Sequence, residues 1–294
     1  MLKRKNKTDA SVGNVLKYRS YIRLGRLGKS RTGRLQPLHC LAKIRMTDFK
    51  IQFVAQTDST NTQLLQRAAR CSMHRQVLVA DVQTAGRGQR GRRWQASAGD
   101  AVLMSVAWEF ERTQRLDGLS LAVGVAVRRG LAEHLGDRAK LKWPNDVLID
   151  ESDKLAGILI ETVPDPFSTR TAVIGIGLNL RSPRLTPTVG ALPSIGLDDV
   201  VGARQSRDDV VALLLTALND ALMQFAKSGF AAFRDEWLSS YAYADKLIVA
   251  RFPNGGQING RIVDVTAQGA LVIESEAGLH TFFSGEVSLR AFGS

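Results

Sequence analysis

The stretch from residue 142 to residue 161 reads KWPNDVLIDESDKLAGILIE and places a turn between two apolar segments. We expect a strand over residues 140–143 that ends at this turn, because Pro144 cannot continue a ladder of backbone hydrogen bonds. Asn145 and Asp146 follow, and their side chains can fix a turn by bonding to nearby backbone groups. That structural role is sufficient to explain both residues.

Turn formation does not explain Lys154. It directly precedes the apolar segment 155–160, and the pattern predicts a strand over residues 157–162. A lysine at that point suits the carboxylate or phosphate of a ligand. The alternative is that the charge protects an edge strand from pairing with another chain.

The most informative segment is residues 83–94, QTAGRGQRGRRW, which we call the Gly-Arg loop. Glycines let backbone amides approach an anion, and guanidinium groups neutralise phosphate or carboxylate oxygens. A flexible basic surface loop would have the same composition. No Gly-Lys-Ser/Thr follows, which excludes a P-loop, and no helix plainly begins on the last glycine, which argues against a dinucleotide-binding turn.

A third motif, GIGLNL at residues 175–180, combines two strand glycines with an asparagine at the strand end. Glycine in a strand allows a ligand or a second backbone to come close. Asn179 would then present its amide to that ligand. Its alternative role is to start a turn.

The remaining pattern alternates strands with helices. Asp58, Ser59, Thr60 and Asn61 form an N-cap cluster before an expected helix. We expect further strands over residues 49–56, 77–83, 101–110 and 172–180, helices over 119–135, 207–227 and 230–241, and a Pro- and Gly-rich loop over 182–202. After residue 244 about five short strands separated by glycine turns predict a small barrel.

The net charge of +12 is confined to one end of the chain. Of the 40 lysines and arginines, 13 lie in residues 1–46, together with only one of the 28 acidic residues. The remaining 248 residues therefore hold 27 of each sign and are formally neutral. This balance gives the body of the protein no polyanion-binding signature.

The composition predicts a folded protein with three parts. We expect a basic extension over residues 1–46, a larger domain of strands and helices over 47–243, and a small β-barrel over 244–294. The extension is either disordered or lies before the true start of the protein at Met46. A transit peptide or a polyanion-binding tail are the alternatives for the extension. No apolar run predicts a membrane span, and two distant cysteines favour a cytoplasmic protein.

The motifs, in this order and spacing, resemble those of the biotin protein ligase family. The resemblance covers residues 49–290 and includes SGEVSLR at residues 284–290. It implies an α+β fold: a mixed-sheet catalytic domain, like those of class II synthetases and of biotin and lipoate ligases, followed by an SH3-like barrel. One position departs from the family pattern, because many members have arginine where this loop has Gln89.

The resemblance also implies a set of site residues. Lys154 and Arg87 are the candidates for catalysis, and Asp146 is a candidate near Mg²⁺. The residues expected to bind biotin or ATP are Ser59, Thr60, Asn61, Gln83, Gly86, Arg87, Gly88, Gln89, Arg90, Arg92, Trp94, Lys154, Gly157 and Asn179.

The activity that the resemblance implies is the ATP-dependent formation of biotinyl-5′-AMP, followed by transfer of biotin to a lysine of a biotin carboxyl carrier protein domain of a carboxylase. The substrates and cofactors are biotin, ATP and Mg²⁺. We expect a monomer or weak homodimer without a membrane partner. A lipoate or octanoate ligase of the same fold is one alternative, and a bifunctional ligase and repressor is another. Without a recognisable helix-turn-helix, we expect no specific DNA binding.

Overall fold

The structure is a computed structural model that describes residues 48–164, 169–183, 192–244, 246–284 and 286–292. The predicted basic extension over residues 1–46 lies outside these ranges, as do part of the predicted loop over 182–202 and Gly285 of the last motif.

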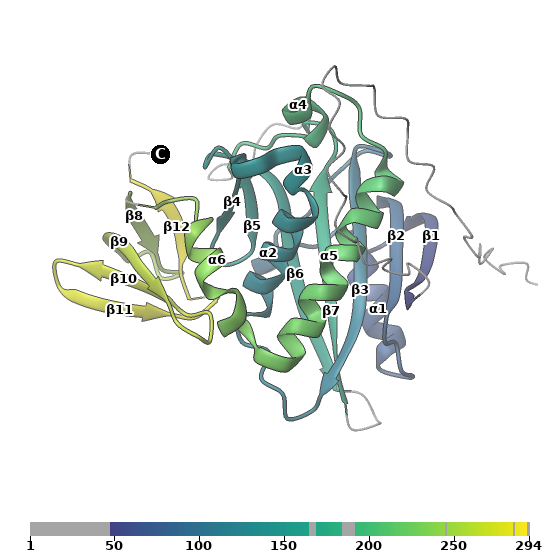
Figure 1. Cartoon of the computed structure of the whole chain (residues 1–294), viewed down its shortest axis with the longest axis horizontal. Coiled ribbons are helices and arrows are strands. Elements are labelled where there is room, and N and C mark those ends of the chain that lie inside the picture. Colours follow the sequence, from purple (N-terminus) through teal and green to yellow (C-terminus); the bar gives the residue numbers. More distant parts are fainter. Residues whose placement is uncertain (1–47, 165–168, 184–191, 245, 285, 293–294) are drawn as a thin grey trace, which may run out of the picture. The chain divides into compact units, whose positions relative to one another are not determined.

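A seven-stranded sheet forms the centre of the described chain (Figure 1). Its strands are β1 (Lys50–Thr57), β2 (Gln76–Gln83), β3 (Ala101–Glu111), β4 (Ala139–Lys142), β5 (Asp146–Ile149), β6 (Asp153–Pro164) and β7 (Thr169–Asn179). Their spatial order is β1-β2-β3-β7-β6-β5-β4. The β1–β2 pair is parallel and the other neighbouring pairs are antiparallel. The sheet is therefore mixed, which confirms the predicted fold class.

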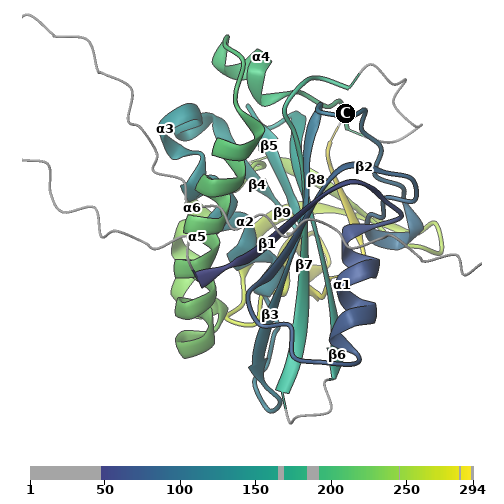
Figure 2. The same ribbon diagram turned by 90° about the vertical axis from the view of Figure 1, so that its right-hand side faces the viewer.

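The alternation of side chains along each strand gives the sheet two apolar faces. In β2, Val77 and Val79 join the larger core, whereas Leu78 joins a smaller core with Leu64 of α1. Figure 2 shows α1 and α5 on opposite sides of the sheet. The helices are α1 (Thr60–Ala68), α2 (Leu119–Gly130), α3 (Ala132–Leu135), α4 (Leu197–Val201), α5 (Arg207–Ser228) and α6 (Arg234–Ser239), with short 3₁₀ turns η2 (Gln89–Gly91), η3 (Gly136–Arg138) and η4 (Phe230–Phe233).

Some predicted elements differ from the observed ones. The helix expected over residues 119–135 divides into α2 and α3, because Leu131 leaves the helical conformation (φ −106°, ψ 7°). The helix expected over 230–241 begins with the 3₁₀ turn η4 and becomes α6 only at Arg234. The predicted loop contains α4. The strand β5 was not expected, because only three apolar residues separate the predicted turn at Asn145 and Asp146 from the acidic segment that begins at Asp150.

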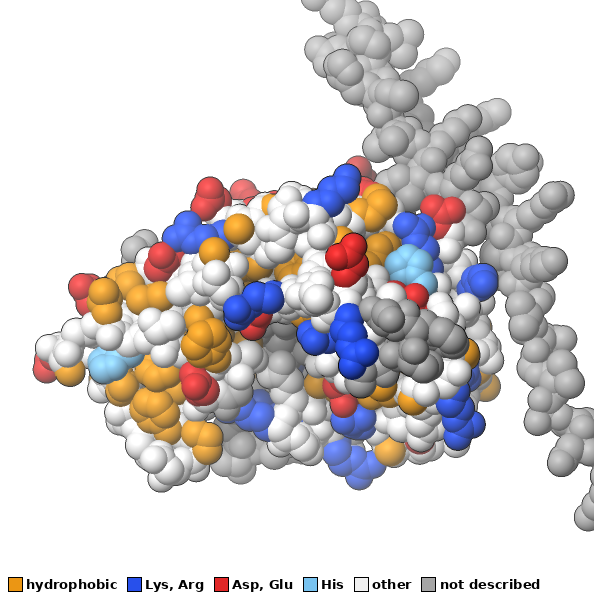
Figure 3. All heavy atoms as spheres, turned by 90° about the horizontal axis from the view of Figure 1, so that it is seen from below, with side chains coloured by type: hydrophobic (Ala, Val, Ile, Leu, Met, Phe, Trp, Pro, Cys, Tyr) orange, Lys and Arg blue, Asp and Glu red, His pale blue; other side chains and the backbone are white. Residues whose placement is uncertain are grey.

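Five strands form a second, antiparallel sheet: β8 (Leu247–Arg251), β9 (Gln257–Val265), β10 (Leu271–Ser275), β11 (Gly278–Phe282) and β12 (Ser288–Ala291). Their order, β11-β10-β9-β8-β12, places β11 and β12 at its two edges. The prediction of a small C-terminal β module is confirmed. Apolar side chains gather over this module at the left of Figure 3. Leu279 and Phe283 are among the exposed apolar residues of the described chain.

Specific contacts connect the second sheet to the first. The indole Nε1 of Trp143 donates a 3.1 Å hydrogen bond to the carbonyl oxygen of Gly269. Arg234 donates from Nε to the carbonyl oxygen of Val265, at 2.7 Å. Both donors precede β8 in the chain, so these bonds tie the five-stranded sheet to the earlier segments.

Among the described residues, α5 is the one helix long and apolar enough in composition to be considered as a membrane span. Leu214, Leu218 and Leu222 of this helix are buried in the core beneath the sheet. This packing is that of the core helix of a globular domain.

Candidate active site

A cavity of about 820 Å³ opens between the central sheet, the Gly-Arg loop and the segment before β12. Of the site residues proposed from sequence, all but Gly86 line it. Gly86 is buried, and a Cβ there would come within 2.3 Å of the Trp94 carbonyl oxygen. Glycine is therefore required at the base of the loop for packing.

One end of the cavity carries neutral hydrogen-bonding groups, and it begins at the N-terminus of α1. Ser59 caps this helix, because its side chain accepts a hydrogen bond from the Thr62 amide. The Oε1 atom of Gln83 accepts from the backbone N of Thr60 at 2.7 Å and from its Oγ1 at 3.1 Å. Two of the predicted site residues, Thr60 and Gln83, thus lie together and are held in one orientation.

Asn61 is fixed from three sides. Its Nδ2 atom donates to the Leu159 carbonyl oxygen at 3.1 Å and to Glu161 Oε2 at 3.0 Å. The hydroxyl of Ser105 lies 2.6 Å from Asn61 Oδ1 and 2.7 Å from Thr60 Oγ1. A Cβ at Gly175 would come within 2.3 Å of Asn61 Oδ1, so this strand glycine makes room for the amide.

Ser105 was not among the predicted site residues. It lies in β3 between apolar neighbours and is fully buried. A buried hydroxyl in an otherwise apolar strand needs a hydrogen-bonding partner. That signal was present in the sequence, although it does not reveal that the partners are Thr60 and Asn61.

The other end of the cavity carries charged groups. The Asp146 carboxylate lies between two ammonium groups, with Lys154 Nζ at 2.6 Å from Oδ1 and Lys142 Nζ at 3.8 Å from Oδ2. Burial would raise the pKa of Asp146, but the two lysines outweigh this effect and hold that pKa below its usual value. Burial lowers the pKa of Lys142 to about 8, although Asp146 opposes the shift.

Strand register brings these groups together. Lys142 ends β4 and faces Asp146 at the start of β5, and Lys154 lies in β6, next to β5. Since β6 is an interior strand between β5 and β7, the alternative that Lys154 protects an edge strand is wrong. Asn145 ties the turn to β6 through a 2.7 Å hydrogen bond to the Ile158 carbonyl oxygen. Asp146 contacts the lysines, so it does not have the predicted turn-fixing role.

Trp94 forms a wall of the cationic end. A Cβ at Gly177 would come within 2.5 Å of its ring, and one at Gly157 within 3.0 Å, so both glycines are needed for the indole to lie against the sheet. Lys154 Nζ lies 5.5 Å from the ring centroid, within the range of a cation–π contact. Asn179 also lines the cavity, and its Nδ2 atom donates a 3.3 Å hydrogen bond to the backbone carbonyl oxygen of Lys154. This bond helps to fix the backbone that carries the lysine.

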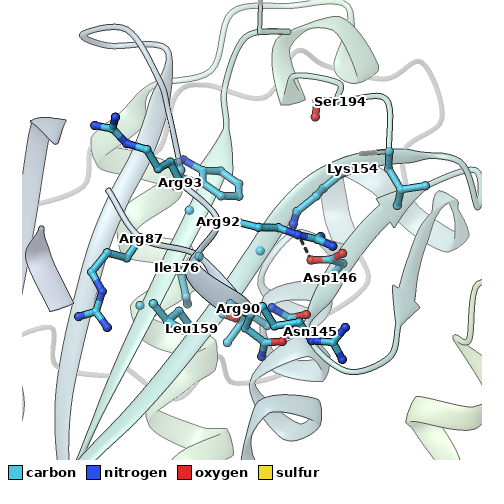
Figure 4. A pocket seen from close by; sticks show the side chains of 18 of the residues that line it. Arg87, Arg90, Arg92, Arg93, Asn145, Asp146, Lys154, Leu159, Ile176 and Ser194 are labelled. Atoms are coloured by element: carbon cyan, nitrogen blue, oxygen red, sulfur yellow. Dashed lines mark hydrogen bonds and ion pairs between the residues drawn. The ribbon is translucent and has the colours of Figure 1, made fainter. Parts of the chain in front are cut away.

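The arginines of the Gly-Arg loop have different surroundings (Figure 4). Arg87 lies apart from Lys154 and forms a 2.5 Å ion pair with Glu161. Arg90 has a left-handed backbone (φ 58°), and its Nη2 donates to the Val287 carbonyl oxygen at 2.5 Å. Arg92 lies beside Lys154 and Asp146 in Figure 4 and contributes to the low pKa of Asp146.

The residues around Asp146 do not fit a protein-held Mg²⁺ site. Within the described ranges, no three His, Cys, Asp or Glu side chains come together to hold a metal ion. The nearest charges to the Asp146 carboxylate are two ammonium groups, which would repel a cation. A metal used here would have to bind largely through the oxygens of the substrate.

A cavity that joins a neutral hydrogen-bonding end to a cationic end suits an enzyme that activates a small carboxylic acid with a polar head group. Residues 53–179 match the model of the biotin/lipoate A/B protein ligase family, and residues 248–290 match the biotin protein ligase C-terminal domain.

Relatives extend this result to most of the chain. The bifunctional ligase/repressor BirA of Escherichia coli is 32% identical over 238 residues, which cover 80% of this chain and 72% of that protein. The biotin–(acetyl-CoA-carboxylase) ligase of Paracoccus denitrificans is also 32% identical over 238 residues, with 98% of its length covered. The biotin protein ligase of Aquifex aeolicus, solved with biotin and ATP, has a TM-score of 0.71 at 28% identity, covering 82% of this chain and 98% of its own. The chain belongs to the biotin protein ligase family and is a ligase.

Proposed function

We propose that this protein joins biotin to ATP as biotinyl-5′-AMP and then transfers the biotinyl group to a lysine of a biotin carboxyl carrier protein domain of a carboxylase. The observation that carries the proposal is the polarity of the cavity: one end has uncharged hydrogen-bonding side chains beside the mutually neutralised Arg87–Glu161 pair, and the other has an excess of cations. Biotin has the same polarity, with an uncharged ureido head and a carboxylate tail. The Aquifex relative was solved with both biotin and ATP, which supports the same pair of substrates here.

At the neutral end, Ser59, Thr60, Asn61 and Gln83 would hydrogen-bond the ureido group. Their mutual bonds, together with Ser105, hold the donors and acceptors in place before the ligand binds. A preorganised polar site discriminates strongly against a ligand that leaves its groups unpaired. This end would therefore select biotin over an acid with an apolar chain.

At the cationic end, the biotin carboxylate would attack the α-phosphorus of ATP, and pyrophosphate would leave. The reaction needs no protein nucleophile, so the protein contributes alignment and stabilisation of negative charge. Lys154 would lie at the carboxylate and the α-phosphate, with Arg92 beside it. In the second step the carrier lysine attacks the mixed anhydride, and the same groups hold the departing AMP.

Several assignments remain proposals. Gly88, Gln89, Trp94 and Gly157 line the cavity where the intermediate would lie. Arg87 is paired with Glu161 and lies apart from Lys154 and Asp146, which makes it a weaker catalytic candidate than Lys154. We propose that Mg²⁺ enters bound to the phosphates of ATP. The three-part domain division, a cytoplasmic location, a monomeric or weakly dimeric state and the absence of specific DNA binding also stay predictions.

The main alternative is a lipoate or octanoate ligase, and the first half-reaction tests it. The purified protein is incubated with Mg²⁺, ATP and one acid, and pyrophosphate release is followed. Biotin should support release, whereas lipoate and octanoate should be at least about 100-fold poorer, since neither can pair with the neutral end. Equal rates with octanoate would reject the assignment.

A further inference from the structure

Two lysines share one carboxylate at the cationic end, and they are buried to different degrees. The Lys142 side chain is 6% exposed, that of Asp146 14% and that of Lys154 25%. Lys154 is the closer partner of Asp146 and also the more accessible from the cavity. Lys142 lies deeper, at 3.8 Å, where its ammonium group is within reach of Asp146 but does not hold it tightly.

A substrate anion would disturb this arrangement. If Lys154 turns to a carboxylate or phosphate in the cavity, its strong contact with Asp146 must weaken. A carboxylate left unpaired in this buried position is costly, so the move would be opposed unless another cation compensates. Lys142 is suitably placed, because it approaches the second oxygen of the same carboxylate.

We propose that Lys142 is a positioning residue that keeps Asp146 neutralised while Lys154 moves from that carboxylate to the substrate. The inference rests on the proposed function, in which Lys154 contacts the reacting carboxylate. It gives Asp146 the role of a counter-ion between two lysines, in place of the Mg²⁺ ligand expected from sequence.

The surroundings of Lys142 are consistent with this role. The charged groups that act on it are Asp146, Lys154, Arg92 and Arg290. Asp146 is the one acid among them, so it is the natural partner of a buried ammonium. Burial lowers the pKa of Lys142 to about 8, and the lysine therefore still carries its charge for the most part at neutral pH.

The first test removes the charge with little change of shape. In Lys142→Met, Lys154 would remain bound to Asp146, so the single-turnover rate of pyrophosphate release from biotin and ATP should fall at least about tenfold. The thermal transition should be unchanged or higher, because a buried charge is removed. Lys142→Arg keeps the positive charge and should stay within about threefold of wild type. Lys140→Met is the matched control, since Lys140 lies on the same strand but outside the cavity, and its rate should not change.

The decisive measurement is a double-mutant cycle with Asp146→Asn. Without the carboxylate there is no charge to neutralise, so adding Lys142→Met to Asp146→Asn should change the rate by less than about threefold. A purely structural role for Lys142 would give the same loss in both backgrounds and would overturn the inference. A wild-type rate in Lys142→Met, or no turnover at all in Asp146→Asn, would also overturn it.

The inference can still be tested if the Lys142→Met variant does not fold. If Lys142→Met does not fold, Lys142→Arg and the double variant decide. A folded Lys142→Arg protein whose rate of pyrophosphate release falls about tenfold or more contradicts the role. A double variant that also fails to fold contradicts it as well. Wild-type protein that releases no pyrophosphate with biotin and ATP would instead reject the proposed function itself, and the inference would fall with it.

Discussion

The two ends of the cavity are built differently. At the neutral end, Ser59, Thr60 and Asn61 are at most 4% exposed, and each is held by bonds from the surrounding backbone or from Gln83 and Ser105. At the cationic end, Lys154 is held by one ion pair and by its contact with Trp94. Recognition of the ligand head group uses side chains that are fixed before binding, whereas Lys154 exchanges Asp146 for the substrate in the mechanism proposed above.

The largest effect is expected at the cationic end. Lys154→Ala removes the ammonium group closest to the reacting carboxylate and should slow adenylate formation about 100-fold. The fold should persist, because the side chain is a quarter exposed. Pyrophosphate release and a thermal melt of the purified variant check both expectations. A rate near that of wild type, with an intact transition, would remove Lys154 from the mechanism.

A smaller effect is expected at the neutral end. Ser105→Ala deprives Asn61 Oδ1 and Thr60 Oγ1 of a buried partner, so the KM for biotin should rise about tenfold with little change in kcat. Ser72→Ala is the control, since this serine bonds Glu109 at an exposed site. An unchanged KM for biotin in a folded Ser105→Ala protein would mean that the neutral end is not the ureido site.

The Gly-Arg loop connects the cavity to the C-terminal module and should have a moderate effect. Gln89 replaces the arginine of many family members, and we expect Arg90 or Arg92 to retain the intermediate in its place. Arg90→Ala removes the bond to Val287 and should speed release of preformed biotinyl adenylate about threefold to tenfold. Gln89→Arg should change the half-life less. A pulse-chase with excess unlabelled ligand measures both.

The opposite result would change this account of the loop. If Gln89→Arg slows release by more than about tenfold while Arg90→Ala and Arg92→Ala do not alter it, the neighbouring arginines do not substitute for the missing one. The protein would then be a ligase that leaks its intermediate.

The smallest effect is expected from the basic extension. Residues 1–45 hold none of the ligase motifs, so their deletion should leave both half-reactions within about twofold of the full chain. Loss of carrier biotinylation by a folded truncated protein would show that the extension contributes to the activity.

The sequence was informative where local pattern determines structure. The strands around residues 77–83 and 101–110 were predictable from their apolar runs, and the N-cap cluster at Ser59 correctly marked the start of α1. The Gly-Arg loop and Lys154 were found by motif, and both reach the cavity.

The parts of the site that could not be predicted depend on contacts between segments that are distant in the sequence. The bond from Asn61 to Glu161 spans 100 residues, and the contact of Arg90 with Val287 spans 197. Neither separation leaves a periodic signal. The placement of Lys142 and Lys154 on either side of Asp146 follows from the register of three strands, and one of these strands, β5, was not predicted. For this reason the sequence suggested a metal for Asp146, where the structure has two lysines.

The central claim is that this protein transfers biotin to a carrier protein, and labelled biotin tests it most directly. The protein is incubated with ATP, Mg²⁺, labelled biotin and a biotin carboxyl carrier domain, and label bound covalently to the carrier is measured. We expect one label on each carrier domain, dependent on ATP and on the acceptor lysine, and no transfer of lipoate under the same conditions. Transfer of lipoate without transfer of biotin would contradict the account.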